Sequence, residues 1–182
     1  MPTLLWAILL AAALPSNATY TVDPAASVVR YTVIHKLHEV HGVSHAVEAK
    51  AVVKEDGQVL AMVRIPVASF RSGDANRDEH MLEAVNAGRF PFVVVKGIAR
   101  LGPGRELPPG ATPTQAQVEL RGVETAQTIP VELALQPDGS VRAHGSFDVS
   151  LDAHHVERPS LLFVRIEDRC HLEFDLAMRA RP

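Results

Sequence analysis

Four of the nine histidines fall within eleven positions, in the stretch HKLHEVHGVSH at 35–45. Imidazole is a common zinc ligand, and a zinc site needs three or four convergent ligands. The tetrapeptide HEVH is one residue shorter than the H-E-x-x-H motif, in which histidines four apart share one face of a helix. His38 and His41 are only three apart in a β-type pattern, so an extended chain would point them to opposite faces.

A turn near Gly42 is expected to separate His35 from His45. A ligand set would then need His80, His154 or His155 to fold nearby. The simpler interpretation is a histidine-rich strand end followed by a loop. We therefore assign no metal ligand and keep histidine-mediated metal binding in the periplasm as an alternative function.

Catalytic signatures are also missing: the chain has no G-x-S-x-G, C-x-x-C, Walker or G-x-G-x-x-G motif. Acidic residues crowd one short segment at 78–83, where helix capping and a solvated face account for them. Arg77 could pair with an anionic head group at a barrel mouth, or tie its helix to a neighbouring carboxylate. No catalytic residue is assigned, and a lipid head-group enzyme is the second alternative.

Length and charge suit one compact domain without nucleic-acid binding. The 182 residues can bury a single core. The chain has 18 basic and 21 acidic residues, giving a net charge of −3, and no basic stripe that could follow a phosphate backbone.

The N-terminus indicates export. Residues 4–14, LLWAILLAAAL, form an uncharged run too short for an ordinary membrane-spanning helix. Small residues Ser16 and Ala18 follow, as signal peptidase prefers. We predict a signal peptide at 1–18, a mature domain at 19–182 and a periplasmic location. The single cysteine, Cys170, excludes an internal disulfide and is expected to be a small buried hydrophobe.

Alternation with a period of two residues returns along most of the mature chain and predicts strands. The eight predicted strands lie near 28–35, 45–54, 58–66, 92–101, 114–121, 127–135, 141–149 and 169–179. Tight turns are expected at 55–57 and 137–139, where glycine supplies positive φ, and a Pro/Gly loop at 102–113. One segment at 73–88 breaks the rhythm and predicts a short helix capped by Asp74 and ended by Gly88.

Eight alternating strands predict an all-β fold, either an antiparallel barrel with one short inserted α-helix or a flattened sandwich. The side chains expected on the apolar face are unusually small. It comprises Val47, Ala49, Ala51, Val53, Val59, Ala61, Val63, Ala116, Val118, Ala143 and Gly145. Small residues leave space inside a barrel, and space lined by Ala and Val suits an aliphatic ligand.

Five motifs in order resemble the YceI-like family of small exported bacterial proteins. They are Tyr-x-x-Asp-x-x-x-Ser from Tyr20, a first strand ending in His35 with Gly42 nearby, Ser69-Phe70, Arg-Asp-x-His-Met from Arg77, and Phe90-Pro91. The resemblance runs from about Thr19 to Arg179. Departures occur at Ser44-His45 and in the stretch at 151–170.

The resemblance implies a lipocalin-like eight-stranded antiparallel barrel that holds a polyisoprenoid or isoprenoid-quinone lipid for sequestration or transport, without enzymatic activity. Aromatic contacts are expected from Tyr31, Phe92, Phe147 and Phe174, and polar contacts from Arg77 and His80. Val33, His35 and Met81 complete the predicted ligand-binding set. No other cofactor is implied. A transient membrane contact and a homodimer are left open.

Overall fold

The computed structural model describes residues 13–35, 38–158, 160–161 and 164–181. The strands are β1 (Thr19–Val22), β2 (Val28–His35), β3 (His38–Ser44), β4 (Glu48–Val53), β5 (Gln58–Pro66), β6 (Phe92–Arg100), β7 (Ala111–Leu120), β8 (Val123–Leu135), β9 (Val141–Ser150), β10 (Ser160–Leu161), β11 (Val164–Arg165) and β12 (Arg169–Arg181). The helices are α1 (Ala75–Ala84) and the 3₁₀ turns η1 (Pro24–Ala26), η2 (Val67–Ser69) and η3 (Pro103–Arg105). None of these described helices is long and apolar enough to span a bilayer.

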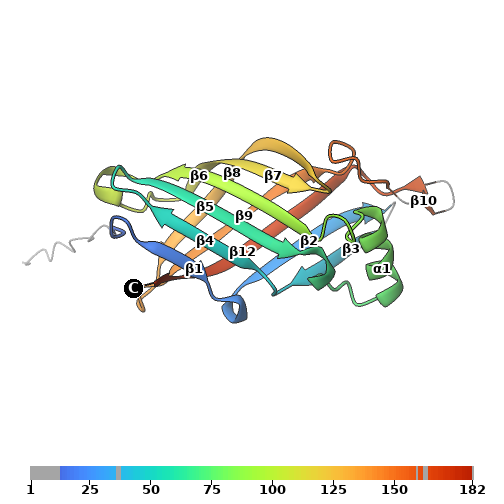
Figure 1. Cartoon of the computed structure of the whole chain (residues 1–182), viewed down its shortest axis with the longest axis horizontal. Coiled ribbons are helices and arrows are strands. Elements are labelled where there is room, and N and C mark those ends of the chain that lie inside the picture. Colours follow the sequence, from blue (N-terminus) through green and yellow to red (C-terminus); the bar gives the residue numbers. More distant parts are fainter. Residues whose placement is uncertain (1–12, 36–37, 159, 162–163, 182) are drawn as a thin grey trace, which may run out of the picture.

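Eight strands close into an antiparallel barrel, as predicted. Their order is β1-β4-β5-β6-β7-β8-β9-β12, and β12 pairs back with β1. The β2–β3 hairpin adds to the sheet through the pairing of β2 with the first half of β12. Figure 1 shows an elongated barrel with α1 at one end. The first described residues, the β4–β5 turn and the loop after β6 lie at the other end.

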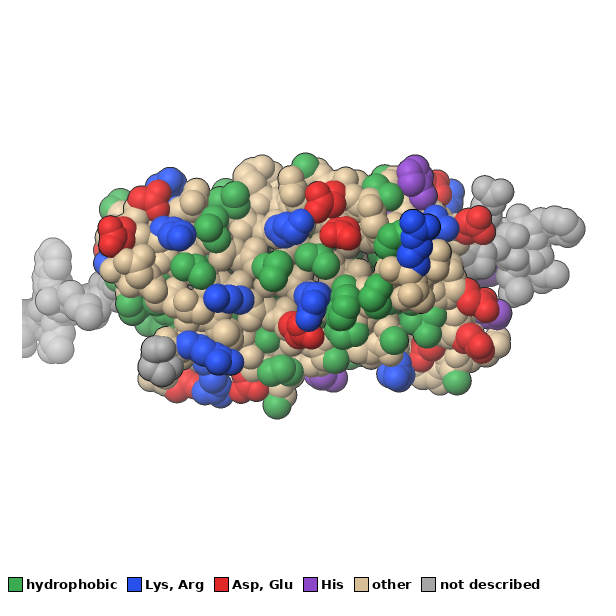
Figure 2. Space-filling view, viewed as in Figure 1, with side chains coloured by type: hydrophobic (Ala, Val, Ile, Leu, Met, Phe, Trp, Pro, Cys, Tyr) green, Lys and Arg blue, Asp and Glu red, His purple; other side chains and the backbone are tan. Residues whose placement is uncertain are grey.

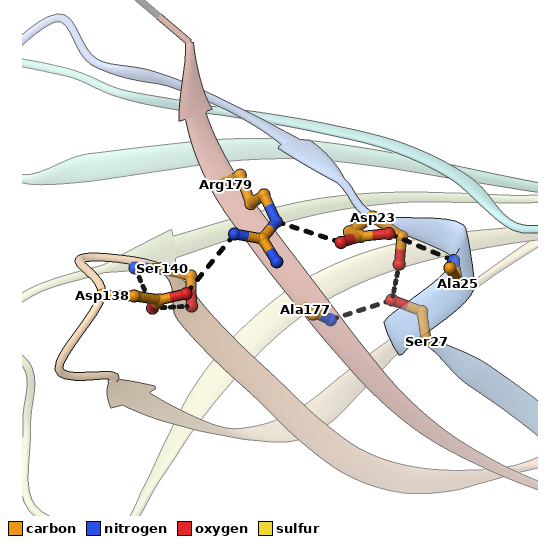
Figure 3. A network of polar contacts seen from close by, with 7 residues as sticks. All are labelled: Asp23, Ala25, Ser27, Asp138, Ser140, Ala177 and Arg179. Carbon is orange, nitrogen blue, oxygen red and sulfur yellow. Dashed lines mark hydrogen bonds and ion pairs between the residues drawn. The ribbon is translucent and has the colours of Figure 1, made fainter.

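A polar network holds the break between β1 and β2 against β12 (Figure 3). Asp23 caps η1 by accepting from the amide of Ala25, and its amide donates to the carbonyl of Ala177. The hydroxyl of Ser27, which is 2% exposed, accepts from the amide of Ala177 at 2.9 Å. Arg179 reaches Asp23 at 3.0 Å and Asp138 at 3.4 Å. The network thus satisfies the backbone where the β ladder is interrupted, which gives the Tyr-x-x-Asp-x-x-x-Ser motif a structural role.

Strand register decides which side chains face inward, because directly paired residues share a face. Val63 pairs with Val95, Val95 with Val118, and Val118 with Thr125. The predicted small-residue face has this same parity. It therefore lines the interior, while Lys50, Leu60, Met62, Lys96 and Ile98 lie outside.

Helix α1 begins as predicted and ends early. Asp74 accepts a hydrogen bond from the amide of Arg77 at 3.0 Å and caps the first turn. The helix stops at Ala84 rather than near Gly88, because Asn86 adopts positive φ at 53° and starts a turn. The tight turns at Gly57 and Gly139 are confirmed, with φ of 80° and 79°.

The expected turn near Gly42 is wrong. Gly42 lies inside β3 and pairs with Tyr31, while His35 pairs with His38 at the hairpin end. A Cβ at Gly42 would lie 2.1 Å from the Tyr31 ring. Glycine is needed here for a close approach of the ring, and the residue does not mark a turn.

Candidate functional site

One wall of the barrel interior consists of very small side chains in direct register. Ala51 on β4 pairs with Ala61 on β5, and Ala61 pairs with Gly97 on β6. Gly97 in turn pairs with Ala116 on β7. Four neighbouring strands therefore present Ala or Gly side by side, with the methyl group of Thr114 against Gly97 and Tyr20 on β1 paired with Ala51.

The wall contributed by β9 and β12 carries the aromatic side chains. The rings of Phe147 and Phe174 lie with centroids 6.4 Å apart, tilted by 57°. Phe174 pairs with Gly145, and a Cβ at that glycine would lie 2.7 Å from the ring. Gly145 therefore lets the phenylalanine lie flat against β9.

The interior between these walls is incompletely filled. A side chain packed inside a filled barrel is fully buried, as Val118 is at 0% exposure. The inward side chains that stay only partly buried include Ala49, Ala51, Ala61, Val63, Val95, Ala143, Phe147 and Phe174. The partly buried inward side chains also include Thr114, Thr125 and Gln127, so the space is mainly apolar with a polar strip on β7 and β8.

Toward α1, the ring of Tyr31 occupies part of the interior. Its ring meets Phe70 edge-on, with centroids 5.4 Å apart, and the two side chains are 9% and 4% exposed. Burial, followed by the nearby carboxylate of Asp78, raises the pKa of the Tyr31 hydroxyl to about 12. Tyr31 therefore presents a neutral hydroxyl among apolar groups at any physiological pH.

A polar cluster joins α1 to the segment before it. The hydroxyl of Ser72 donates to Asp78 at 2.6 Å, and the Ser72 amide donates to the same carboxylate at 2.9 Å. The hydrogen bond from the Ser72 hydroxyl is the largest cause of the lowered pKa of Asp78. The guanidinium of Arg77 donates to the Ser72 hydroxyl at 3.0 Å. Arg77 thus contacts the start of its own helix and lies exposed on the surface.

The structure brings together only part of the predicted ligand-binding set. Tyr31, Val33, Met81, Phe147 and Phe174 belong to the core cluster or pack against it. His35 has the inward parity at the tip of the β2–β3 hairpin. His80 is exposed on α1 and lies 3.4 Å from Glu83, away from the interior.

Phe92 lies apart from the other predicted aromatics. It pairs with Pro66 and has the outward parity of Arg64, whose guanidinium lies 4.3 Å from the ring centroid. The expectation that Phe92 contributes to the interior is therefore corrected. Phe70 supplies an aromatic ring there instead, although its place in the motif Ser69-Phe70 gave no sign of its direction.

The clustered histidines do not meet at one point: His35 and His38 pair on one face at the end of the β2–β3 hairpin, and the other two have separate partners. His41 faces outward and shares a hydrogen bond of 2.9 Å with Thr32, while the ring of His45 donates to the carbonyl of Ser27 at 2.8 Å. Within the described residues, no three His, Cys, Asp or Glu side chains gather as metal ligands would. The histidines that lie close together in the sequence therefore do not form a metal site within the described residues.

Cys170 and His154 are of residue types that often carry function, but here both serve packing. Burial raises the pKa of the inward-facing Cys170 thiol to about 12, so it stays protonated. His154, which the sequence offers only as a possible extra metal ligand, is 1% exposed and donates from Nδ1 to the carbonyl of Ser150 at 2.8 Å. Its Nε2 lies 3.2 Å from the hydroxyl of Thr125. His154 therefore anchors the segment after β9 to the barrel.

Two hollows on the outer surface have mixed or charged linings. One lies beside η3 and the β4–β5 turn, against residues 55–57 and 100–105. The other lies between α1 and residues 86–88. Neither is lined by as many apolar side chains as the interior, so the interior is the better candidate site for an aliphatic ligand.

Comparison with known proteins agrees with this architecture. The YceI-like domain family matches residues 20–178. The structure of Burkholderia cenocepacia BcnA superposes with a TM-score of 0.73 at 19% identity, covering 86% of this chain and 98% of that one. A polyisoprenoid binding domain from Saccharophagus degradans, implicated in plant cell wall breakdown, gives 0.72 at 15% identity, covering 89% and 98%. A variant of the Campylobacter jejuni YceI protein gives 0.60 at 11% identity, covering 81% and 88%. Among curated proteins none matches the chain.

Proposed function

Because the chain belongs to the YceI-like domain family, we propose that it binds a lipid with a polyisoprenoid or isoprenoid-quinone chain in its barrel interior. The observation that carries this proposal is the pairing of a small-residue wall with an aromatic wall. Ala51, Ala61, Gly97 and Ala116 are small inward residues on β4 to β7, and Phe147 and Phe174 point inward from β9 and β12. The neighbouring Saccharophagus degradans structure, described as a polyisoprenoid binding domain, supports the choice of ligand class.

Hydrophobic transfer is sufficient to hold such a chain. Burial of an aliphatic chain gains roughly 0.8 kcal/mol per CH₂ group. Part of this gain offsets the lost motion of the ligand. The protein then acts by sequestering or carrying the lipid, and no nucleophile or acid–base pair is required.

The proposal includes a periplasmic location and brief contact with a membrane during loading. The apolar run at 4–14 supports export. Apolar side chains also lie on the outer face over β4, β5 and β6, interspersed with Lys and Arg (Figure 2). Leu60, Met62 and Ile98 on this face are 36%, 52% and 48% exposed. Such a surface suits transient contact with a lipid headgroup layer.

Native mass spectrometry of protein purified from its own host, combined with lipid extraction, tests the proposed function. We expect a bound species whose mass fits a polyprenyl or quinone lipid. We also expect the emptied protein to take up such a lipid in a one-to-one ratio. Purification without any lipid, together with no uptake of quinones or polyprenyl compounds, would contradict the proposal. Stoichiometric zinc in dialysed protein would favour the histidine alternative instead.

A further inference from the structure

A strip of polar side chains faces the barrel interior on β7 and β8. The register gives it Thr112 and Thr114 on β7, and Thr125 and Gln127 on β8. Gln127 pairs with Ala116, so it continues the cross-strand row of Ala and Gly residues that begins on β4. The strip therefore places polar groups directly beside the small-residue wall.

Two members of this strip have partners within the protein. The hydroxyl of Thr125 lies 3.2 Å from Nε2 of His154, which is itself buried. The hydroxyl of Thr114 donates to the carbonyl of Thr112 at 3.4 Å. The hydrogen-bonding needs of these two threonines are met by the chain itself.

The other two members lack such partners. Within the described residues, the partly buried side-chain amide of Gln127 has no hydrogen-bond partner. The hydroxyl of Thr112 has none either, although this residue is only 3% exposed. A polar group that leaves water without gaining a partner costs free energy, so buried polar groups are nearly always paired. The strip thus has hydrogen-bonding capacity that the protein does not use.

The surroundings of Gln127 are uncharged. The structure describes all eight strands of the barrel, and none of their inward positions carries a Lys, Arg, His, Asp or Glu residue. A phosphate drawn into this space would lose its hydration without meeting a cation, which is costly. A neutral oxygen avoids this cost and can still form a hydrogen bond.

We propose that the Gln127 amide binds the neutral oxygen of the lipid, a hydroxyl or a carbonyl, and so selects a polyprenyl alcohol or quinone over a polyprenyl phosphate. The inference rests on the proposed function. The NH₂ group of the amide donates to either kind of oxygen, and its carbonyl accepts from a hydroxyl. Ala116, directly opposite on β7, presents only a methyl group and does not compete for the amide.

Three ligands that share one polyprenyl chain test this role in the full-length protein: the alcohol, the monophosphate and the hydrocarbon without a head group. We expect Gln127→Met, which keeps the side-chain length, to lower the affinity for the alcohol about 10-fold, as the loss of one hydrogen bond does. The hydrocarbon should bind to this variant at least as tightly as before. The unsubstituted protein should bind the monophosphate at least about 10-fold more weakly than the alcohol, because its charge lacks a partner inside.

Gln117→Met is the matched control, since Gln117 is exposed on the outer face of β7, where it pairs with Lys96. It should leave all three affinities unchanged. An unchanged affinity of Gln127→Met for the alcohol, an equal loss for the alcohol and the hydrocarbon, or a monophosphate bound as tightly as the alcohol would each overturn the proposal. If the unsubstituted protein binds none of the three ligands, the proposed function fails as well, whereas binding that does not depend on Gln127 overturns this inference alone.

The side-chain amide resonances of Gln127 give a second readout that needs no variant. In the NMR spectrum of the unsubstituted protein, we expect them to shift more on addition of the alcohol than on addition of the hydrocarbon. Equal shifts with the two ligands would overturn the contact between the amide and the head group.

Discussion

Gly145→Val is expected to lower the free energy of unfolding by about 3 kcal/mol, the upper part of the range for overpacked cores. A Cβ at this position would lie 2.5 Å from the carbonyl oxygen of Pro130 and 2.7 Å from the ring of Phe174. The ring can rotate, but the carbonyl belongs to β8, which pairs with β9 at this point. The barrel wall itself would have to move.

Denaturant unfolding measures this effect, with His144→Val as the control on the exposed face of the same strand. A second variant, Gly145→Ala with Phe174→Ala, removes the ring and leaves the carbonyl. Because Phe174→Ala itself empties part of the core, we expect the double variant to be less stable than Phe174→Ala alone, by the cost of the contact with the Pro130 carbonyl. A free energy of unfolding for Gly145→Val within about 0.5 kcal/mol of the unsubstituted protein would show that β8 and β9 do not pair this closely.

Ala61→Phe is expected to weaken binding of a polyprenyl lipid about 100-fold, since displacing three to four CH₂ groups removes roughly 2.7 kcal/mol. Ala61 faces the interior between Ala51 and Gly97, where a benzyl group would occupy the space left by the small-residue wall. The variant should fold, because this space is incompletely filled.

The control for Ala61→Phe is Leu60→Phe, the neighbouring position on the same strand. Leu60 faces outward and is 36% exposed. Titration of both purified variants with one polyprenyl ligand, alongside thermal unfolding, separates binding from stability. Ala61→Leu should give an intermediate loss. Equal affinity of the Ala61 and Leu60 variants would place the ligand outside the barrel.

The barrel could be predicted from the sequence because alternation is a local signal that survives in each strand. The small interior residues share one parity along β4, β5 and β9, and the register confirms that they face inward. The N-cap at Asp74 is likewise local: one side chain bonds to an amide three residues later.

The direction of Phe92 could not be predicted because the run from Phe92 to Val95 is apolar throughout and hides the alternation. Only the pairing of β6 with β5 fixes its outward direction. The same kind of limit applies to Gly42. Glycine is a common turn residue. The close approach of the Tyr31 ring to Gly42 is known only once β2 and β3 are paired.

A tertiary contact also decides what the sequence left open for Arg77. The guanidinium of Arg77 could equally have served a ligand or the helix, and it bonds to Ser72. Gly97 could not be predicted as part of the inward face, because a single glycine within a strand gives no periodic signal.

The most direct test of a lipid chain inside the barrel is to locate that chain by NMR in protein loaded with a polyprenyl lipid. With methyl-labelled alanine, leucine, methionine and isoleucine, we predict intermolecular NOEs from the ligand to the methyl groups of Ala51, Ala61 and Ala143. NOEs confined to Leu60, Met62 and Ile98 on the outer face would contradict the account.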